Sequence, residues 1–225
     1  MHVISHRGYH VNLPENTLEA FRAAIEMGVD GIETDIRLTA DGVPVLVHDH
    51  LTRDGRAVFA LSHAELNAVT GHVVPTVEQA LDLPVPDAEK FLWNLEVKTP
   101  AAIEQTIAIV NRYRGRRKLL VTSFCHPAIV EISRQAEVEC GLLVCHRPVE
   151  MRERPAWVPE HPRVTSIVWC WEFADAELIA QSAASGLKNF VYGLTTLEEH
   201  SLAASWKLDG VITDRPEYMH DVAPK

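Results

Sequence analysis

The sequence predicts an α/β fold of the (β/α)8 barrel type, in which eight parallel strands are each followed by a helix. Two observations carry this prediction: short β-rich runs alternate with helical patterns, and eight such runs fit within 225 residues. The alternative is an open doubly wound sheet, but no Gly-x-Gly-x-x-Gly loop follows the first run. No linker or low-complexity tract interrupts the chain, so we expect residues 1–225 to form one domain.

Hydrophobic periodicity and turn residues set the bounds of each element. In the first helix, 15–27, Leu18, Phe21 and Ile25 recur at helical spacing, and Gly28 follows as a stop. The expected strands are 2–6, 31–37, 91–97, 118–123, 141–145, 164–170, 189–193 and 209–213. The expected helices are 15–27, 76–83, 101–112, 127–137, 174–185 and 196–206.

One further β-rich run, VPVLVH at 43–48, does not fit the alternation. It follows the second strand after a link centred on Asp41 and Gly42, which is far too short for a parallel crossover. Asp-Gly is a strong hairpin signal, so we expect this run to fold back antiparallel on the second strand. That pairing brings His48 roughly opposite Glu33.

Two other segments depart from the repeat. Residues 50–75 are expected to form a short excursion over one end of the barrel. Four prolines within 146–163 predict that any helix there is short or broken.

Composition excludes several classes of partner. A net charge of −10 argues against a nucleic-acid surface or an anionic membrane surface. No signal peptide is visible, and no apolar run reaches the roughly 18 residues that span a bilayer. None of the four cysteines forms a Cys-x-x-Cys pair, which favours reduced thiols. We therefore expect a soluble, cytoplasmic protein without a stable membrane anchor.

Polar side chains gather where the predicted strands end, which is where a (β/α)8 enzyme carries its chemistry. Side chains alternate across a strand, so Glu33 and Asp35 share one face, as do Asn94, Glu96 and Lys98. Both charged faces are expected to point into the mouth of the barrel. The other polar or aromatic residues near these ends are His6, Arg7, His48, Asp49, Thr122, Ser123, Trp169 and Tyr192.

These residue types together indicate phosphodiester cleavage. Three converging carboxylates repel one another unless a cation joins them, and all-oxygen ligands suit Mg²⁺ or Ca²⁺ rather than zinc. Arg7 grips a phosphate through a bidentate fork, and Lys98 adds a point charge. Of the two histidines, His6 and His48, one can take a proton from a nucleophile while the other protonates a leaving group.

Several of these residues have a plainer explanation. Glu33 and Asp35 could belong to a solvated strand face, and Lys98 could simply pair with Glu96. Near the C-terminus, Asp214 precedes an Arg-Pro pair and is predicted to be a helix N-cap rather than a catalytic residue.

The ordered set of motifs resembles the glycerophosphodiester phosphodiesterase family over residues 2–218. The motifs that carry the resemblance are His6-Arg7-Gly8, Pro14-Glu15-Asn16-Thr17, Glu33-x-Asp35, Asp41-Gly42, His48-Asp49, Asn94-Leu95-Glu96-Val97-Lys98, Ser123-Phe124 and Asp209-Gly210-Val211-Ile212-Thr213-Asp214-Arg215-Pro216. No single motif is specific, but their order is.

The resemblance implies a TIM barrel that hydrolyses glycerophosphodiesters, a small-molecule substrate class, to sn-glycerol 3-phosphate and an alcohol. The residues that it implies are His6 and His48 as general acid and base, Glu33, Asp35 and Glu96 as ligands of one divalent cation (Mg²⁺ or Ca²⁺), Arg7 and Lys98 as phosphate-binding residues, and Glu15 and Asn16 as supporting residues.

The predicted pocket departs from the family pattern near the end of the seventh strand. The family often has a Trp-Thr-Val-Asn-like stretch where this chain has Tyr192-Gly193-Leu194-Thr195, so Tyr192 keeps an aromatic wall without the amide. Trp169 is predicted as a second pocket residue. A lysophospholipid substrate and a non-catalytic phosphodiester-binding barrel are the alternative functions. The sequence leaves the alcohol, the ion, the direction of proton transfer and the oligomeric state open.

Overall fold

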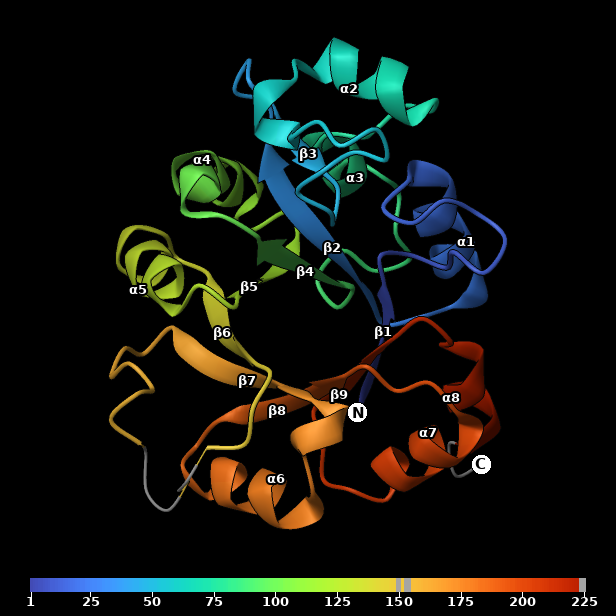
Figure 1. Ribbon diagram of the computed structural model, residues 1–225. Coiled ribbons are helices and arrows are strands. Elements are labelled where there is room, and N and C mark those ends of the chain that lie inside the picture. Colours follow the sequence, from blue (N-terminus) through green and yellow to red (C-terminus); the bar gives the residue numbers. More distant parts are fainter. Residues whose placement is uncertain (149–150, 152–154, 223–225) are drawn as a thin grey trace.

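The computed structural model describes residues 1–148, 151 and 155–222 of the chain. Its sheet closes into a barrel of eight parallel strands, because β1 pairs with β2 on one side and with β9 on the other. Helices form a ring around these strands (Figure 1). The predicted (β/α)8 fold is confirmed.

The predicted strands and helices all have counterparts in the structure. The barrel strands are β1 (His2–His6), β2 (Gly31–Leu38), β4 (Leu92–Val97), β5 (Lys118–Ser123), β6 (Glu139–Val144), β7 (Val164–Cys170), β8 (Lys188–Tyr192) and β9 (Gly210–Thr213). The α-helices are α1 (Leu18–Met27), α2 (His63–Thr70), α3 (Val77–Leu81), α4 (Ile103–Tyr113), α5 (His126–Gln135), α6 (Ala176–Ala184), α7 (Leu197–Ala204) and α8 (Glu217–Val222). Short 3₁₀ turns are η1 (Val58–Ala60), η2 (Pro100–Ala102) and η3 (Trp171–Phe173).

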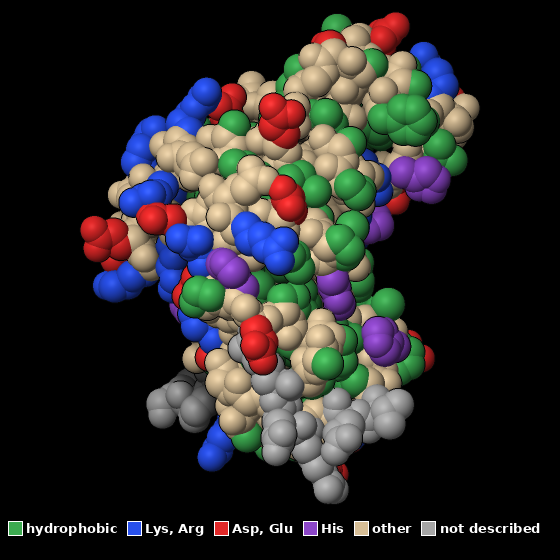
Figure 2. Space-filling model, turned by 90° about the vertical axis from the view of Figure 1, so that its left-hand side faces the viewer, with side chains coloured by type: hydrophobic (Ala, Val, Ile, Leu, Met, Phe, Trp, Pro, Cys, Tyr) green, Lys and Arg blue, Asp and Glu red, His purple; other side chains and the backbone are tan. Residues whose placement is uncertain are grey.

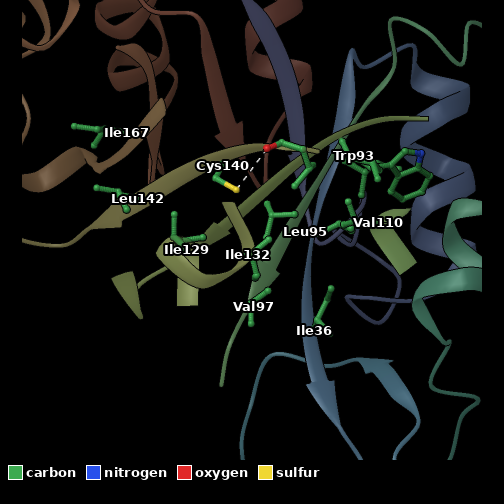
Figure 3. Packing of buried hydrophobic residues seen from close by; sticks show 14 of the residues in the cluster. Ile36, Trp93, Leu95, Val97, Val110, Ile129, Ile132, Cys140, Leu142 and Ile167 are labelled. Carbon is green, nitrogen blue, oxygen red and sulfur yellow. Dashed lines mark hydrogen bonds between the residues drawn. The ribbon is translucent and has the colours of Figure 1, made fainter. Parts of the chain in front are cut away.

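Alternation along the strands separates two hydrophobic layers. The layer inside the barrel consists of Ile4, Leu92, Leu120, Leu143, Val168, Phe190 and Ile212. The larger layer lies between strands and helices, where Figure 3 shows Trp93, Leu95 and Val97 of β4. Asn94 and Glu96 alternate with these three residues, so the packing of β4 against the helices turns both polar side chains into the barrel.

The predicted hairpin is present and explains how a histidine from outside the barrel reaches its mouth. β3 (Pro44–Leu46) pairs antiparallel with β2. On that edge of β2, β1 pairs only as far as Glu33, and β3 pairs from Ile36 onward. β3 therefore runs toward the end of β1 and delivers His48 to the cavity that also contains His6. The register lies within one residue of the predicted pairing.

The excursion that follows the hairpin, residues 50–75, contains η1 and α2, which the sequence patterns do not predict. Four of its residues pack with Val45 of β3 in a small separate core; they are Val58, Leu61, Leu66 and Val74. In Figure 1 this part lies at the top, outside the ring of the other helices.

In the proline-rich segment, residues 149–150 and 152–154 lie outside the described residues. The described remainder, residues 146–148, 151 and 155–163, has no helix. Among all the helices that the structure describes, none is long and apolar enough to span a membrane.

Gly8 fixes the exit of the chain from β1 toward α1, and we predict that Gly8→Ala destabilises the fold. Its φ is 78°, and a Cβ there would lie 2.7 Å from the carbonyl carbon of Ala20 in α1. Left-handed strain and steric crowding together should cost about 2–4 kcal/mol of unfolding free energy. Urea denaturation measures this loss.

Gly28→Ala is the matched control for this prediction. Gly28 also has a positive φ, 85°, but a Cβ there meets nothing within 4 Å. The expected loss of unfolding free energy is then about 1–2 kcal/mol, from backbone strain alone. Equal losses in the two variants would show that contact with Ala20 does not constrain the loop after β1.

Candidate active site

A cavity at the carboxyl ends of the strands brings most of the predicted site residues together. Its lining residues are His6, Arg7, Glu33, His48, Asn94, Glu96, Lys98, Thr122, Phe124, Leu143, Tyr192 and Ile212. Figure 2 shows the molecule hollowed along its right-hand side, with several histidine side chains (purple) along the hollow.

Three carboxylates from two neighbouring strands form a buried cluster beneath this cavity. Glu33 and Asp35 of β2 and Glu96 of β4 each place a carboxylate oxygen within 4.8 Å of the others. Burial, together with the charges of Asp35 and Glu96, raises the pKa of Glu33 well above its usual value. Neither oxygen of Glu33 accepts a hydrogen bond from the described residues. Three buried oxygen donors with open lone pairs fit a hard divalent cation such as Mg²⁺ or Ca²⁺.

Two cations flank the same cluster. Lys98 Nζ lies 2.8 Å from Glu96 Oε1 and 3.3 Å from Asp35 Oδ1, and Arg7 Nε lies 3.3 Å from Asp35 Oδ2. Burial alone would raise the pKa of Asp35, but Lys98 and Arg7 outweigh it and lower that pKa. Asp35 is therefore ionised, and its charge holds both cations at the edge of the cavity.

Arg7 is fixed in an unusual backbone conformation. Its φ of 55° lies in the left-handed region, which costs a non-glycine residue about 1 kcal/mol or more. Its amide donates to the carbonyl oxygen of Glu33 at 2.8 Å, which ties the end of β1 to β2. Its guanidinium donates through Nη1 to both carboxylate oxygens of Glu15, at 3.0 and 2.9 Å. Glu15 thus holds the predicted phosphate-binding residue in place.

Asn16 supports the carboxylate cluster directly. Its Nδ2 donates to Asp35 Oδ2 at 2.8 Å, and its Oδ1 accepts from the Thr34 hydroxyl at 2.6 Å. It also has a φ of 55° and is buried. The structure therefore brings Asn16 to the cluster, where it orients Asp35.

The two predicted catalytic histidines are held in the same way. His6 Nδ1 lies 2.6 Å from Asp214 Oδ1, and His48 Nδ1 lies 2.8 Å from Asp49 Oδ1. A carboxylate partner places the proton on Nδ1 and leaves Nε2 as the free nitrogen. In His6, that Nε2 lies 3.7 Å from Glu33 Oε2, beyond hydrogen-bond distance.

The backbone of His48 has its own support. Arg37 of β2 donates to the carbonyl oxygen of His48 from Nε at 2.9 Å and from Nη2 at 2.7 Å. This contact fastens the end of the hairpin to the strand that carries Glu33 and Asp35. Sequence reasoning missed Arg37, although its position two residues after Asp35 on the same strand face was visible.

Asp214 and His10 are the other residues that the sequence did not assign to the site. The predicted N-cap role of Asp214 is wrong: its Oδ1 accepts from His6 Nδ1 and from His10 Nε2, the latter at 3.0 Å, and α8 begins only at Glu217. Burial would raise the pKa of Asp214, but the hydrogen bonds from His10 and His6 hold it well below its usual range. The bond to Asp214 in turn raises the pKa of His10.

Of the two predicted aromatic pocket residues, only Tyr192 reaches the cavity. It meets Phe124 edge-on, with ring centroids 6.0 Å apart. Trp169 is buried on the opposite face of its strand, where Nε1 donates to Asn189 Oδ1 at 2.9 Å. Its neighbour Val168 occupies the inward position, so alternation directs Trp169 toward the helices.

Known proteins share this architecture over nearly the whole chain. Residues 6–218 match the family described as the glycerophosphoryl diester phosphodiesterase family. A glycerophosphodiester phosphodiesterase of Caldanaerobacter subterraneus subsp. tengcongensis is 30% identical over 249 residues, covering 99% of this chain and 98% of its own.

Two solved structures show the same barrel. A glycerophosphodiester phosphodiesterase of Thermotoga maritima has a TM-score of 0.78 and 25% identity, covering 98% of this chain and 97% of its own. An Oleispira antarctica phosphodiesterase, solved in complex with the product sn-glycerol-3-phosphate, has a TM-score of 0.80 and 25% identity, covering 99% of this chain and 96% of its own.

Proposed function

Since the chain belongs to the glycerophosphoryl diester phosphodiesterase family, we propose that it hydrolyses glycerophosphodiesters to sn-glycerol 3-phosphate and an alcohol. The observation that carries this proposal is the shared cavity, in which two carboxylate-held histidines face a buried cluster of three carboxylates and two cations. The Oleispira antarctica relative, whose solved complex contains sn-glycerol-3-phosphate as its product, supports the choice of substrate class.

Glu33, Asp35 and Glu96 are the residues that would hold one divalent cation, Mg²⁺ or Ca²⁺. Their three oxygen donors and the unpaired lone pairs of Glu33 fit such an ion. When bound, it neutralises negative charge that develops on the phosphoryl oxygens. Asn16 keeps Asp35 oriented toward the cluster through its hydrogen bond.

Arg7 and Lys98 bind the phosphate of the substrate. Both side chains line the cavity, and both are already paired with buried carboxylates, which keeps them ordered before substrate arrives. Preorganised cations stabilise charge in the transition state without the cost of reorganisation. Glu15 accepts two hydrogen bonds from the guanidinium of Arg7 and thereby fixes its orientation.

His6 and His48 transfer the protons. In each ring Nδ1 donates to a carboxylate, so Nε2 is the nitrogen that exchanges protons with substrate. One neutral ring accepts the proton of the attacking hydroxyl at Nε2, and the other, protonated at Nε2, donates to the leaving alkoxide. Asp214 and Asp49 act as positioning residues, because they fix ring orientation and stabilise the imidazolium.

The proposal is tested by offering the purified protein a panel of glycerophosphodiesters with Mg²⁺ or Ca²⁺. Release of sn-glycerol 3-phosphate, followed with a coupled dehydrogenase, is expected from glycerophosphocholine and its ethanolamine and glycerol analogues. Lysophosphatidylcholine is the comparison substrate: the same cleavage gives lysophosphatidic acid and choline, so its rate is followed as choline release and is expected to be lower than that of glycerophosphocholine. A higher rate on the lysophospholipid, or no release of sn-glycerol 3-phosphate from any panel member, would contradict the proposed substrate class.

A further inference from the structure

A second group of metal-ligating atoms lies beside the carboxylate cluster. His6 Nδ1 and His10 Nε2 lie 2.6 and 3.0 Å from the same oxygen, Asp214 Oδ1. All three donor atoms fall within 4.8 Å of one another. The side chains of His6 and His10 are 24% and 22% exposed, and that of Asp214 is half-exposed, so an ion in solution can reach them.

The donor set differs in kind from that of the carboxylate cluster. Two imidazole nitrogens and one carboxylate oxygen suit borderline ions such as Zn²⁺ and Co²⁺. Mg²⁺ and Ca²⁺ instead prefer ligand sets made of oxygen alone. Three protein ligands with an open position are a common arrangement for zinc. The chain therefore places a nitrogen-rich donor set and an oxygen-only donor set on opposite sides of His6, whose Nε2 lies 3.7 Å from Glu33.

The two separations from Asp214 require little movement to admit an ion. Tetrahedral zinc with bonds of about 2.0 Å separates neighbouring ligand atoms by about 3.3 Å. The existing separations from Asp214 Oδ1, 2.6 Å to His6 and 3.0 Å to His10, are those of hydrogen bonds. Replacing each bridging proton by one shared ion would move the donors apart by less than about 1 Å.

We propose that His6, His10 and Asp214 form a binding site for a borderline divalent cation, with Zn²⁺ as the best fit, and that an ion bound there inhibits the enzyme. A bond from the ion to His6 Nδ1 displaces the proton of that nitrogen to Nε2 of the same ring. His6 then has no lone pair to accept a substrate proton as a base, and as an acid its neutral Nε2–H is much weaker than that of an imidazolium, so either role is impaired. The ion also takes Asp214 away from its positioning contact with His6. Inhibition rests on the proposed function, whereas binding of the ion does not.

The first test measures hydrolysis of glycerophosphocholine in excess Mg²⁺ while Zn²⁺ is titrated. For the unmodified protein, saturating Zn²⁺ should reduce the rate by about 10²-fold or more, the loss expected when one acid–base group is disabled. His10→Ala removes one ligand and should raise the Zn²⁺ concentration for half-inhibition by about 10- to 100-fold. Each variant is compared with its own rate in the absence of Zn²⁺.

His72→Ala is the matched control, because His72 is an exposed histidine outside the cavity. It should leave the Zn²⁺ dependence unchanged. Equal inhibition of the unmodified protein and of His10→Ala would overturn the proposal, since the ion would then act at another place.

The second test does not depend on turnover. Co²⁺ is added to the protein in saturating Mg²⁺, which occupies the oxygen ligands, and visible absorption reports Co²⁺ bound to imidazole. The band should be present in the unmodified protein and in His72→Ala, and absent from His10→Ala. Circular dichroism confirms that His10→Ala is folded. A band that survives in folded His10→Ala would refute the site, even if no substrate of the enzyme were found.

Discussion

His6→Ala and His48→Ala are each expected to lower kcat for glycerophosphodiester hydrolysis by about 10²–10⁴-fold. The reason is geometric: each ring donates from Nδ1 to its own carboxylate and leaves Nε2 in the same cavity. Removal of either ring deprives the reaction of one proton transfer, while Arg7 and Lys98, the proposed phosphate-binding residues, and the carboxylates proposed to hold the divalent cation remain in place. The KM should therefore change much less than kcat. Steady-state kinetics with glycerophosphocholine measure both quantities.

Controls separate this loss from misfolding. Both imidazoles lie at the cavity surface and are partly exposed, so urea denaturation midpoints of the two variants should stay close to that of the unmodified protein. His72→Ala, at an exposed histidine away from the cavity, should keep full activity. Near-normal kcat in folded His6→Ala or His48→Ala would remove that histidine from the mechanism.

Removal of the divalent ion by EDTA is expected to reduce turnover by at least about 10³-fold, since a bound ion is worth several kcal/mol of charge stabilisation. Arg7 and Lys98 are already paired with Asp35 and Glu96, so on their own they offer little unbalanced positive charge to a phosphate. Without the ion, the cluster supplies no further positive charge to the phosphoryl oxygens. Added Mg²⁺ or Ca²⁺ should restore the rate, and full activity after thorough chelation would contradict the assignment of the cluster.

The affinity for that ion should depend on pH. Burial and neighbouring charges raise the pKa of Glu33 in the ion-free protein, so the carboxyl gains a proton more readily than an exposed glutamate. An ion binds the carboxylate and must displace that proton. The Mg²⁺ concentration for half-maximal activity should therefore fall as the pH rises through the titration of Glu33, and a rise would contradict the placement of Glu33 among the ligands.

Much of the fold and the position of the site could be predicted because they depend on local patterns. The two-residue period of β2 and β4 placed Glu33, Asp35 and Glu96 on one face, and packing of the alternate residues against helices directs that face inward. The Asp-Gly turn predicted the hairpin and hence the return of His48. Each inference needs only neighbouring residues and a general rule of sheet geometry.

The partners of His6 could not be predicted from such patterns. Asp214 lies 208 positions away in the chain and reaches His6 only because β9 closes the barrel against β1. Asp214 directly follows β9, and polar residues at the ends of the first strands were assigned to the site on that ground. For Asp214, however, the helix expected after Pro216 favoured a local role as an N-cap. His10 lies in a loop without periodicity, so no pattern directs its side chain.

Trp169 illustrates a different failure. The sequence correctly placed Trp169 near the end of a strand, but the prediction that its side chain faces the pocket was wrong. Val168 holds the inward position on β7. A count of alternate positions from Val168 would have directed the indole toward the helices.

The most direct test of the central claim is the ³¹P NMR spectrum of glycerophosphocholine incubated with the protein and Mg²⁺. Phosphodiesters and phosphomonoesters give separate resonances, and the two monoesters that cleavage can produce are distinguished by added standards. We predict that the diester signal is replaced by that of sn-glycerol 3-phosphate, and that His48→Ala leaves the diester intact. A phosphocholine signal, or an unchanged diester in the presence of the unmodified protein, would contradict the proposed reaction.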